Sequence, residues 1–244
     1  MNRDEIVSII ENYAPAELQE EWDNSGWQIR LPFEDIGKVL LCVTVTKDVV
    51  AQAIERGVNL IISHHPLFFS EIKVIDDDIV YELIKHDIQV YSAHTNFDRA
   101  NEGTSGILAR KLGFDNLEKI DDYIQIATLD EAWTIDNLVI KVKLELNLEK
   151  LQVISYKPDV MVKRVAFVAG SGGEFIEKLK THNIDVFITS DIKYHNEVKN
   201  TNYVIFDVGH LESERPALDK FEELLKDRGF EIFRANEKSK KVYL

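Results

Sequence analysis

The run K-V-L-L-C-V-T-V at 38–45, followed by a helical segment and by V-N-L-I-I at 58–62, decides the fold class. The first run is almost continuously apolar and rich in β-branched residues, which predicts a strand buried on both faces. Residues 48–56 carry apolar side chains at helical spacing and stop at Gly57, a residue type that commonly ends helices. Strand, helix and strand in this order indicate a parallel βαβ unit, and therefore an α/β protein.

The same patterns extend outward from this unit in both directions. They predict helices at 4–13, 78–86, 104–112, 174–182 and 213–227, and strands at 88–92, 163–168, 185–189, 203–208 and 231–234. Residues 20–27 are rich in turn formers and are expected to be irregular. Apolar and charged residues alternate in I-K-V-K-L-E-L at 140–146, so we interpret 123–130 and 138–147 as antiparallel strands with one solvated face.

The two halves of the chain repeat one plan. A strand near 39–45 leads through a helix to V-N-L-I-I-S-H-H, and a strand at 165–169 leads through a helix to I-D-V-F-I-T-S-D. The first repeat ends at His64 and His65, and the second ends at Asp191. We therefore expect two similar lobes, 1–122 and 123–244, each with a mixed sheet and flanking helices. The C-terminal segment is a candidate to be intertwined with the first lobe.

Each half then has one more strand, which is followed by a histidine with a carboxylate four residues on. The pairs are His94 with Asp98 and His210 with Glu214. Ligands of open parallel sheets bind beyond the carboxyl ends of the strands. A site in the cleft between the two lobes would bring both sets of polar groups together.

The composition limits which classes of function are open. The chain has 244 residues, with 29 Lys and Arg against 43 Asp and Glu, so its formal net charge is −14. Such a surface repels a phosphate backbone, which argues against nucleic-acid binding. No apolar run approaches the roughly 18 residues of a membrane span, and M-N-R-D-E-I-V-S-I-I at the start does not resemble a secretory signal. The single cysteine, Cys42, excludes an internal disulfide and cysteine-based metal sites, so we expect a cytoplasmic protein whose metal ligands are His, Asp or Glu.

The histidines and carboxylates at the strand ends suit a pair of divalent ions. Neighbouring side chains on an extended backbone point to opposite sides, so His64 and His65 could serve two ions, or one of them could bind alone. The alternative is that both merely cap a strand. His210 and Glu214 share one face if a helix begins near His210, and a carboxylate there could bridge two cations or simply cap that helix.

Two further clusters follow strands of the second half. Glycines at 170, 172 and 173 could present backbone amides to a phosphate, or could form only a tight turn between strand and helix. In T-S-D-I-K-Y-H at 189–195, Asp191 and His195 could act as general acid and base or hold metal-bound water. The alternative assigns them to a helix cap and the protein surface.

Five motifs, in this order along the chain, resemble a known family. They are W-D-N-S-G at 22–26, I-I-S-H-H-P-L-F-F at 61–69, A-H-T-N-F-D at 93–98, T-S-D-I-K-Y-H at 189–195 and G-H-L-E-S-E at 209–214. The chain resembles the NIF-three-like dinuclear metal centre family, whose members are known as type 2 homologues of GTP cyclohydrolase I. The resemblance implies a toroidal homohexamer of two-lobed α/β subunits, with two metal ions in the cleft of each subunit.

Carried over position by position, the resemblance assigns the metal ligands, with Glu214 as the bridge. The implied ligands are His64, His65, Asp98, His210 and Glu214, and His94 then lies beside them. The metals that suit this set are iron, zinc, manganese and cobalt. The chain departs from the family pattern at Thr44, where members usually have Asp, and at Ser190, where they usually have Gly.

Two functions remain open on this basis. The first is a metal-dependent hydrolase of a nucleotide-like substrate, and the resemblance implies attack on the purine ring of GTP. His94, Asp191 or His195 would then serve in catalysis, while Gly170, Ser171 and Gly172 would hold phosphate. The second is a non-catalytic metal-binding, metal-delivery or scaffold protein with the same ligands. A dinuclear phosphoesterase is disfavoured, because no G-D or G-N-H-E/D motif follows a strand.

Overall fold

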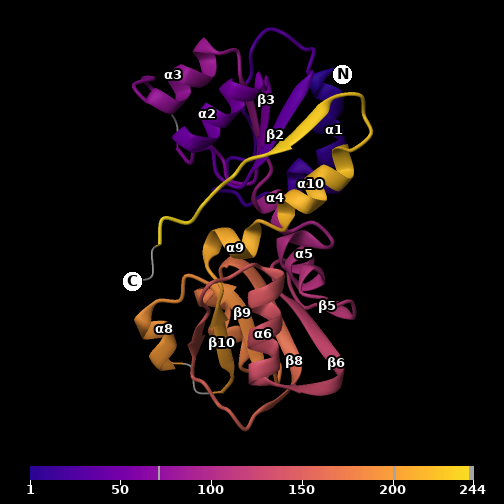
Figure 1. The fold of residues 1–244 in the computed structure, drawn as a ribbon, viewed down its shortest axis with the longest axis vertical. Coiled ribbons are helices and arrows are strands. Elements are labelled where there is room, and N and C mark those ends of the chain that lie inside the picture. Colours follow the sequence, from indigo (N-terminus) through magenta and orange to yellow (C-terminus); the bar gives the residue numbers. More distant parts are fainter. Residues whose placement is uncertain (71, 200–201, 242–244) are drawn as a thin grey trace. The chain divides into compact units, whose positions relative to one another are not determined.

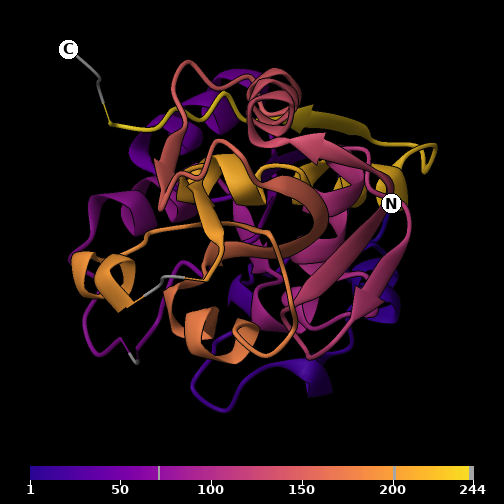
Figure 2. The ribbon, with the colours of Figure 1, turned by 90° about the horizontal axis from the view of Figure 1, so that it is seen from below.

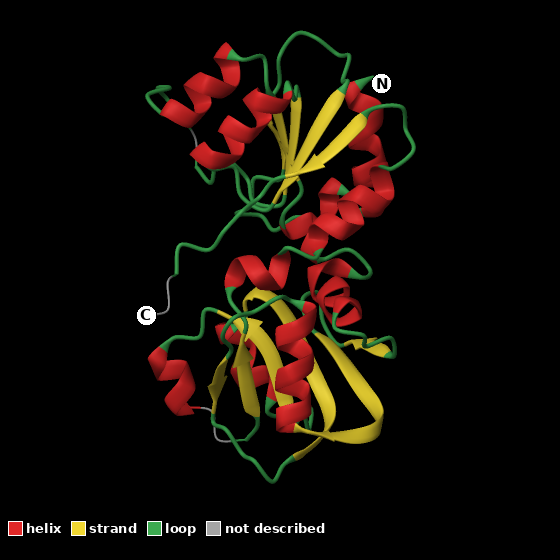
Figure 3. Ribbon diagram, viewed as in Figure 1, coloured by secondary structure: helices red, strands yellow, loops and turns green. Residues whose placement is uncertain are grey.

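The computed structural model describes residues 1–70, 72–199 and 202–241. The chain forms two compact units, each with a mixed sheet and flanking helices (Figures 1 and 3). The first unit combines Met1–Asn101 with Ala217–Leu244, and the second is Glu102–Pro216. The boundaries between the units therefore lie after residues 101 and 216, whereas the sequence analysis expected one boundary, after residue 122.

The first sheet has the order β1-β4-β3-β2-β11. Its strands are β1 (Gly26–Ile29), β2 (Lys38–Cys42), β3 (Leu60–Ser63), β4 (Gln89–Ser92) and β11 (Glu231–Arg234). Strands β11, β2, β3 and β4 are parallel, and β1 pairs antiparallel with β4. The C-terminal strand therefore completes the first sheet.

Helices cover both faces of this sheet (Figure 1). Helices α2 (Lys47–Arg56) and α3 (Asp78–Lys85) lie on one face, and α1 (Arg3–Tyr13) and α10 (Ala217–Leu225) lie on the other. Helix α2 begins where the Thr46 side chain accepts a hydrogen bond from the Val49 amide, and it ends at Gly57 with φ +64°. The predicted strand–helix–strand unit is confirmed, because β2 and β3 pair in parallel through α2.

The second sheet has the order β5-β6-β8-β9-β10-β7. Its strands are β5 (Leu117–Lys119), β6 (Gln125–Thr134), β7 (Gln152–Ile154), β8 (Met161–Ser171), β9 (Val186–Ser190) and β10 (Val204–Asp207). Strands β8, β9 and β10 are parallel, and β7 pairs antiparallel with β10. The first sheet repeats this plan with β2, β3, β4 and antiparallel β1, so the predicted duplication is present in the strand topology.

The remaining helices, most of them short, lie in the connections between the other elements. They are α4 (Thr95–Asp98), α5 (Gly103–Lys111), α6 (Ile135–Glu145), α7 (Ile176–Leu179), α8 (Tyr194–Lys199), α9 (His210–Glu214), and the 3₁₀ turns η1 (Ala16–Leu18) and η2 (Gly173–Phe175). In the described part of the chain, every helix is too short or too polar to cross a membrane.

The interpretation of 138–147 as a strand was wrong, because this segment belongs to α6, which is seen end-on in Figure 2. Ile135, Leu138 and Val142 are fully buried at helical spacing, and Thr134 caps the helix. Apolar side chains at alternate positions are also compatible with a helix, when only three apolar side chains lie on its buried face. The helix expected at 213–227 is split into α9 and α10 around Pro216, which cannot donate a backbone hydrogen bond. The segment expected to be irregular at 20–27 contains the start of β1.

Candidate metal centre

Three imidazoles gather beyond the carboxyl ends of β3 and β4 in the first unit. His64 and His65 follow β3 directly, and His94 follows β4 by two residues. The two strands are parallel neighbours, with Ser63 opposite Ser92, so their ends lie side by side. One ring nitrogen of each histidine lies within 4.8 Å of the other two.

His64 is held as a tautomer suited to metal binding. It is fully buried, and its Nδ1 lies 2.9 Å from the carbonyl oxygen of Ala93. A carbonyl only accepts, so Nδ1 carries the hydrogen and Nε2 presents its lone pair. That Nε2 lies 3.5 Å from Oδ1 of Asp98, at the end of α4. Nitrogen and carboxylate donors therefore converge.

His65 faces the same cluster rather than the opposite side. The ring centroids of His64 and His65 are 5.3 Å apart, because the backbone bends directly after β3 instead of continuing as a strand. Its Nδ1 lies 2.8 Å from Oγ1 of Thr44, so Nε2 is the nitrogen suited to a metal. Thr44 stands where the family resemblance leads one to expect Asp. Its hydroxyl orients His65, which is a proposed ligand.

His94 is oriented by a buried carboxylate that was not among the site residues predicted from the sequence. Its Nδ1 lies 2.8 Å from Oδ1 of Asp23, which also accepts hydrogen bonds from Ser25 and Thr95. Burial favours a higher pKa for Asp23, but the hydrogen bonds from His94, Thr95 and Ser25 outweigh it and hold that pKa well below its usual range. The available signal was an acidic residue within the irregular motif W-D-N-S-G.

Two exposed aromatic rings stand against the His94 imidazole. The rings of Trp22 and Phe69 each have their centroid 6.0 Å from that of His94, and both stand nearly perpendicular to it. Trp22 is 64% exposed and Phe69 is 60% exposed. Large aromatic faces beside a polar cluster are suited to stacking on a planar ligand.

The second unit places one imidazole between two carboxylates. His210 is the first residue of α9, and its Nε2 lies 3.1 Å from Oε2 of Glu214. Its Nδ1 lies 2.6 Å from Oδ2 of Asp191. The hydrogen bond to Glu214 raises the pKa of His210 to about 9, burial opposes this rise, and Asp191 adds to it. The predicted helical pairing of His210 and Glu214 is confirmed.

The glycine-rich segment makes room for Glu214. Gly170 has φ +70°, and a Cβ there would overlap Oε1 of Glu214. Its N–H donates to Oγ of Ser213 at 2.9 Å, so this amide already has a partner within the unit. The Ser190 hydroxyl donates to the Gly170 carbonyl at 2.6 Å, which gives this second departure from the family pattern a structural role. A Cβ at Gly172 would overlap Thr189 in the same way.

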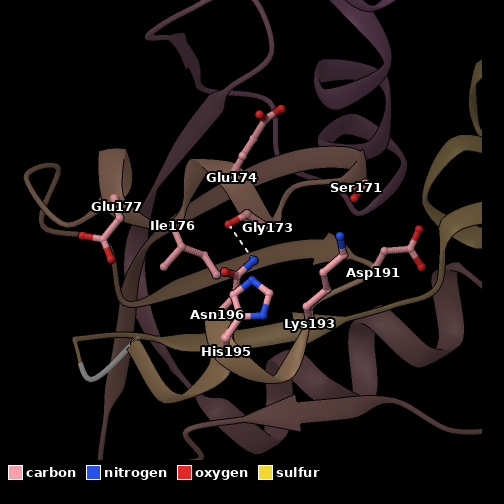
Figure 4. Close-up of a pocket in the computed structure, with 9 residues that line it drawn as sticks. All are labelled: Ser171, Gly173, Glu174, Ile176, Glu177, Asp191, Lys193, His195 and Asn196. Carbon is pink, nitrogen blue, oxygen red and sulfur yellow. Dashed lines mark hydrogen bonds between the residues drawn. The ribbon is translucent and has the colours of Figure 1, made fainter.

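A pocket of about 510 Å³ borders this second cluster (Figure 4). Its lining residues are Ser171, Gly173, Glu174, Ile176, Glu177, Asp191, Lys193, His195 and Asn196. Figure 4 shows the Asp191 and Lys193 side chains at one end of the pocket and Glu177 at the other. Asp191 thus belongs both to the pocket and to the hydrogen bond that orients His210.

Comparisons with known proteins cover almost the whole chain. The family model described as Duf34/NIF3 (NGG1p interacting factor 3) matches residues 1–240. A Clostridium perfringens protein named GTP cyclohydrolase 1 type 2 homolog is 34% identical over 243 residues, which cover 93% of this chain and 92% of that protein. A Helicobacter pylori (strain J99) protein named GTP cyclohydrolase 1 type 2 is 33% identical over 220 residues, or 86% of each chain.

Solved structures share the fold along the same length. The Bacillus cereus protein related to NIF3 aligns with a TM-score of 0.89 at 23% identity, over 100% of this chain and 99% of its own. Reduced HcgD from Methanocaldococcus jannaschii aligns with a TM-score of 0.84 at 26% identity, over 97% of this chain and 98% of its own.

Proposed function

The chain belongs to the Duf34/NIF3 family, and from that premise we propose that it binds two divalent metal ions and hydrolyses a nucleotide-like substrate. Ring hydrolysis of the GTP cyclohydrolase type is the chemistry that the names of its relatives suggest. The proposed ligands are His64, His65 and Asp98 of the first unit, and His210 and Glu214 of the second, with Glu214 as the bridge.

The convergence of imidazole nitrogen and carboxylate oxygen within each unit carries this proposal. His64 Nε2 lies 3.5 Å from Asp98, and His210 Nε2 lies 3.1 Å from Glu214. In His64, His65 and His210, the other ring nitrogen is engaged by a carbonyl, a hydroxyl and a carboxylate, respectively. Metal-ligating histidines commonly have such a partner.

The donor set fits hydrolytic metals. Nitrogen and oxygen donors without thiolate suit iron, zinc, manganese or cobalt. A divalent ion held there would act as a Lewis acid and would lower the pKa of water toward neutrality.

Two side chains, His94 and His195, are proposed to handle protons around the metals. Asp23 fixes the His94 ring with Nδ1–H toward the carboxylate, so Nε2 can take or give a proton, as in other Asp–His pairs. His195 lines the pocket and is proposed as a second acid or base. Asp191 is proposed to act mainly by holding His210.

The substrate features rest on the pocket and on the exposed rings. A volume of about 510 Å³ lies within the range of small-molecule sites. Ser171 and Lys193 line this pocket and offer a hydroxyl and an ammonium to a phosphate, in a segment where Gly170 and Gly172 were also predicted to contribute. Trp22 and Phe69 offer ring faces to a planar base.

Metal analysis paired with a substrate screen tests this function. Protein purified without added metal should contain about two divalent ions per chain, as measured by elemental mass spectrometry. Incubation with nucleotides should change the purine absorbance of one of them, and His195→Ala should abolish that change while His86→Ala, an exposed histidine, should not. Two tightly held ions with no turnover of any nucleotide would favour the metal-delivery or scaffold function instead.

Self-association into a homohexamer is a further part of the proposal. Apolar side chains such as Leu144, which is 75% exposed, and Val74, which is 70% exposed, are candidates for burial between copies. Light scattering at micromolar concentration should give about six times the 28.1 kDa of one chain, and a monomer would contradict this. With the lone Cys42 buried, the chain also suits a reducing compartment such as the cytoplasm.

A further inference from the structure

The segment after β11 continues beside β2 in the first sheet and contacts the loop that follows β2. The Ala235 amide donates to the Leu41 carbonyl at 2.9 Å, continuing the ladder. Glu237 then accepts two hydrogen bonds with one carboxylate, from the Val43 amide at 2.7 Å and from the Thr44 amide at 2.9 Å. Bonds to an ionised acceptor are about twice as strong as neutral ones.

The loop that Glu237 holds is also the loop that orients His65. Thr44 Oγ1 lies 2.8 Å from His65 Nδ1, and the His65 amide donates to the Val43 carbonyl at 2.8 Å. Residues 43 and 44 are therefore fixed on one side by the Glu237 carboxylate and on the other by His65. Glu237 is 193 residues from Thr44 in sequence, so only the fold brings them together.

We propose that Glu237 is a positioning residue for the metal ligand His65 and that it acts through Thr44. The inference rests on the metal site of the proposed function. Two bonds to successive amides fix the backbone of Thr44, and this backbone sets where its hydroxyl lies. The hydroxyl in turn sets the direction in which Nε2 of His65 points.

The consequence is a dependence of metal affinity on the C-terminal segment. Loss of a partner that orients a ligand typically lowers metal affinity about 10- to 100-fold. Glu237→Gln leaves one oxygen to accept and places an NH₂ group against an amide donor, so one of the two bonds is lost. Thr44→Val removes the hydroxyl at nearly constant shape, and Thr44→Ser keeps it.

Cobalt titration of the full chain, stripped of metal with a chelator, tests the inference. We expect Glu237→Gln and Thr44→Val each to weaken one of the Co²⁺ sites about 10- to 100-fold and to shift its visible absorption bands. Thr44→Ser should bind as the parent does. Glu231→Gln is the matched control, because Glu231 is an exposed carboxylate of the same C-terminal segment whose described ion pair, with Lys38, spans 4.0 Å. Its Co²⁺ affinities should not change.

A double-variant cycle separates positioning from stability. In a His65→Ala background, Glu237→Gln should cause no further loss of Co²⁺ affinity, because its effect passes through the missing ring. A lower Tm of the metal-free protein with unchanged Co²⁺ affinity would overturn the inference, and so would additive losses in the double variant. A parent chain that binds no Co²⁺ would overturn the proposed function together with the inference. Two Co²⁺ ions in the parent, one in His65→Ala and unchanged affinity in both Glu237→Gln and Thr44→Val would overturn the inference alone.

Discussion

The two units prepare their proposed ligands in different ways. In the first unit, His64 and His65 have neutral partners at Nδ1, a carbonyl and a hydroxyl, and His64 is fully buried. In the second, His210 lies between the carboxylates of Glu214 and Asp191, which together raise its pKa to about 9. The Nδ1 partners of the proposed ligands are thus neutral in the first unit, whereas in the second unit two carboxylates favour a proton on His210 that would compete with a metal.

The same sequence offset also produces different partnerships in the two units. Strands β4 and β10 are each followed by a histidine with a carboxylate four residues on. In the second unit that carboxylate, Glu214, contacts its own histidine, His210. In the first unit Asp98 contacts His64, and His94 pairs with Asp23. Duplicated topology therefore fixes where polar groups gather, while local contacts decide which of them form a pair.

Replacing Glu214, the proposed bridging ligand, should have the largest effect on metal content. Glu214→Gln removes a charge that would serve both ions, so we expect the metal content to fall from about two ions to below one. His64→Ala should remove mainly one ion. Elemental analysis of both variants measures this difference, with Glu212→Gln, on the same helix, as a control that should retain both ions. A Glu214→Gln protein that retains both ions would contradict the bridging role.

His195 should matter for turnover and not for metal. A positioned acid or base typically contributes about 10²- to 10⁴-fold to a rate, so His195→Ala should lose most activity on the substrate that the screen identifies. Its metal content should remain at two ions, because no proposed ligand depends on it. If metal content falls instead, His195 is itself a ligand. If activity is unchanged, the proton moves through His94 and its partner Asp23.

The proton on His210 predicts a pH dependence of metal binding. An imidazolium cannot bind a metal, and the neutral fraction falls tenfold for each pH unit below the pKa of about 9. Metal affinity of the site that uses His210 should therefore rise about tenfold per pH unit up to that pKa and level off above it.

Asp191→Asn sharpens this comparison, because it removes one of the two carboxylates that raise the pKa of His210. The affinity of that site should then level off at a lower pH. Its plateau should also be lower, by about 10- to 100-fold, since the ring loses the partner that orients it. Co²⁺ titrations from about pH 6 to about one unit above the pKa of His210 measure both changes. A pH profile that is the same in the parent, Asp191→Asn and His210→Ala would show that another group sets the slope.

The sequence predicted the elements that local chemistry determines. Helix α2 follows from its apolar spacing and from Gly57, and the i, i+4 contact of His210 with Glu214 follows from helix geometry. The apolar alternation around 140–146 fits both a strand and a helix, and burial by the second unit's core selected the helix.

The residues that orient the histidines of the site could not be predicted in this way. Asp23 contacts His94 across 71 positions, Thr44 contacts His65 across 21, and Glu237 contacts Thr44 across 193. No periodic pattern records such distant contacts, because they depend on how strands and loops pack in three dimensions. The histidines and carboxylates of the candidate metal centre could be named from the sequence because they follow predicted strand ends, while their supporting partners come from elsewhere in the chain.

Two glycines with similar φ angles give the smallest and most controlled test. Gly57 has φ +64°, and a Cβ there would meet open space among the described residues, while Gly170 has φ +70° and a Cβ there would overlap Glu214 Oε1. An alanine in the left-handed region costs about 1–2 kcal/mol, so Gly57→Ala should lower the free energy of unfolding by about that amount and leave metal binding unchanged. Gly170→Ala should cost at least as much, and it should also weaken metal binding because Glu214 must move. Chemical denaturation of the metal-free proteins and Co²⁺ titration measure the two effects separately. Equal metal affinity in both variants would mean that Glu214 tolerates displacement, and the second unit's carboxylate would then be less constrained than its contacts indicate.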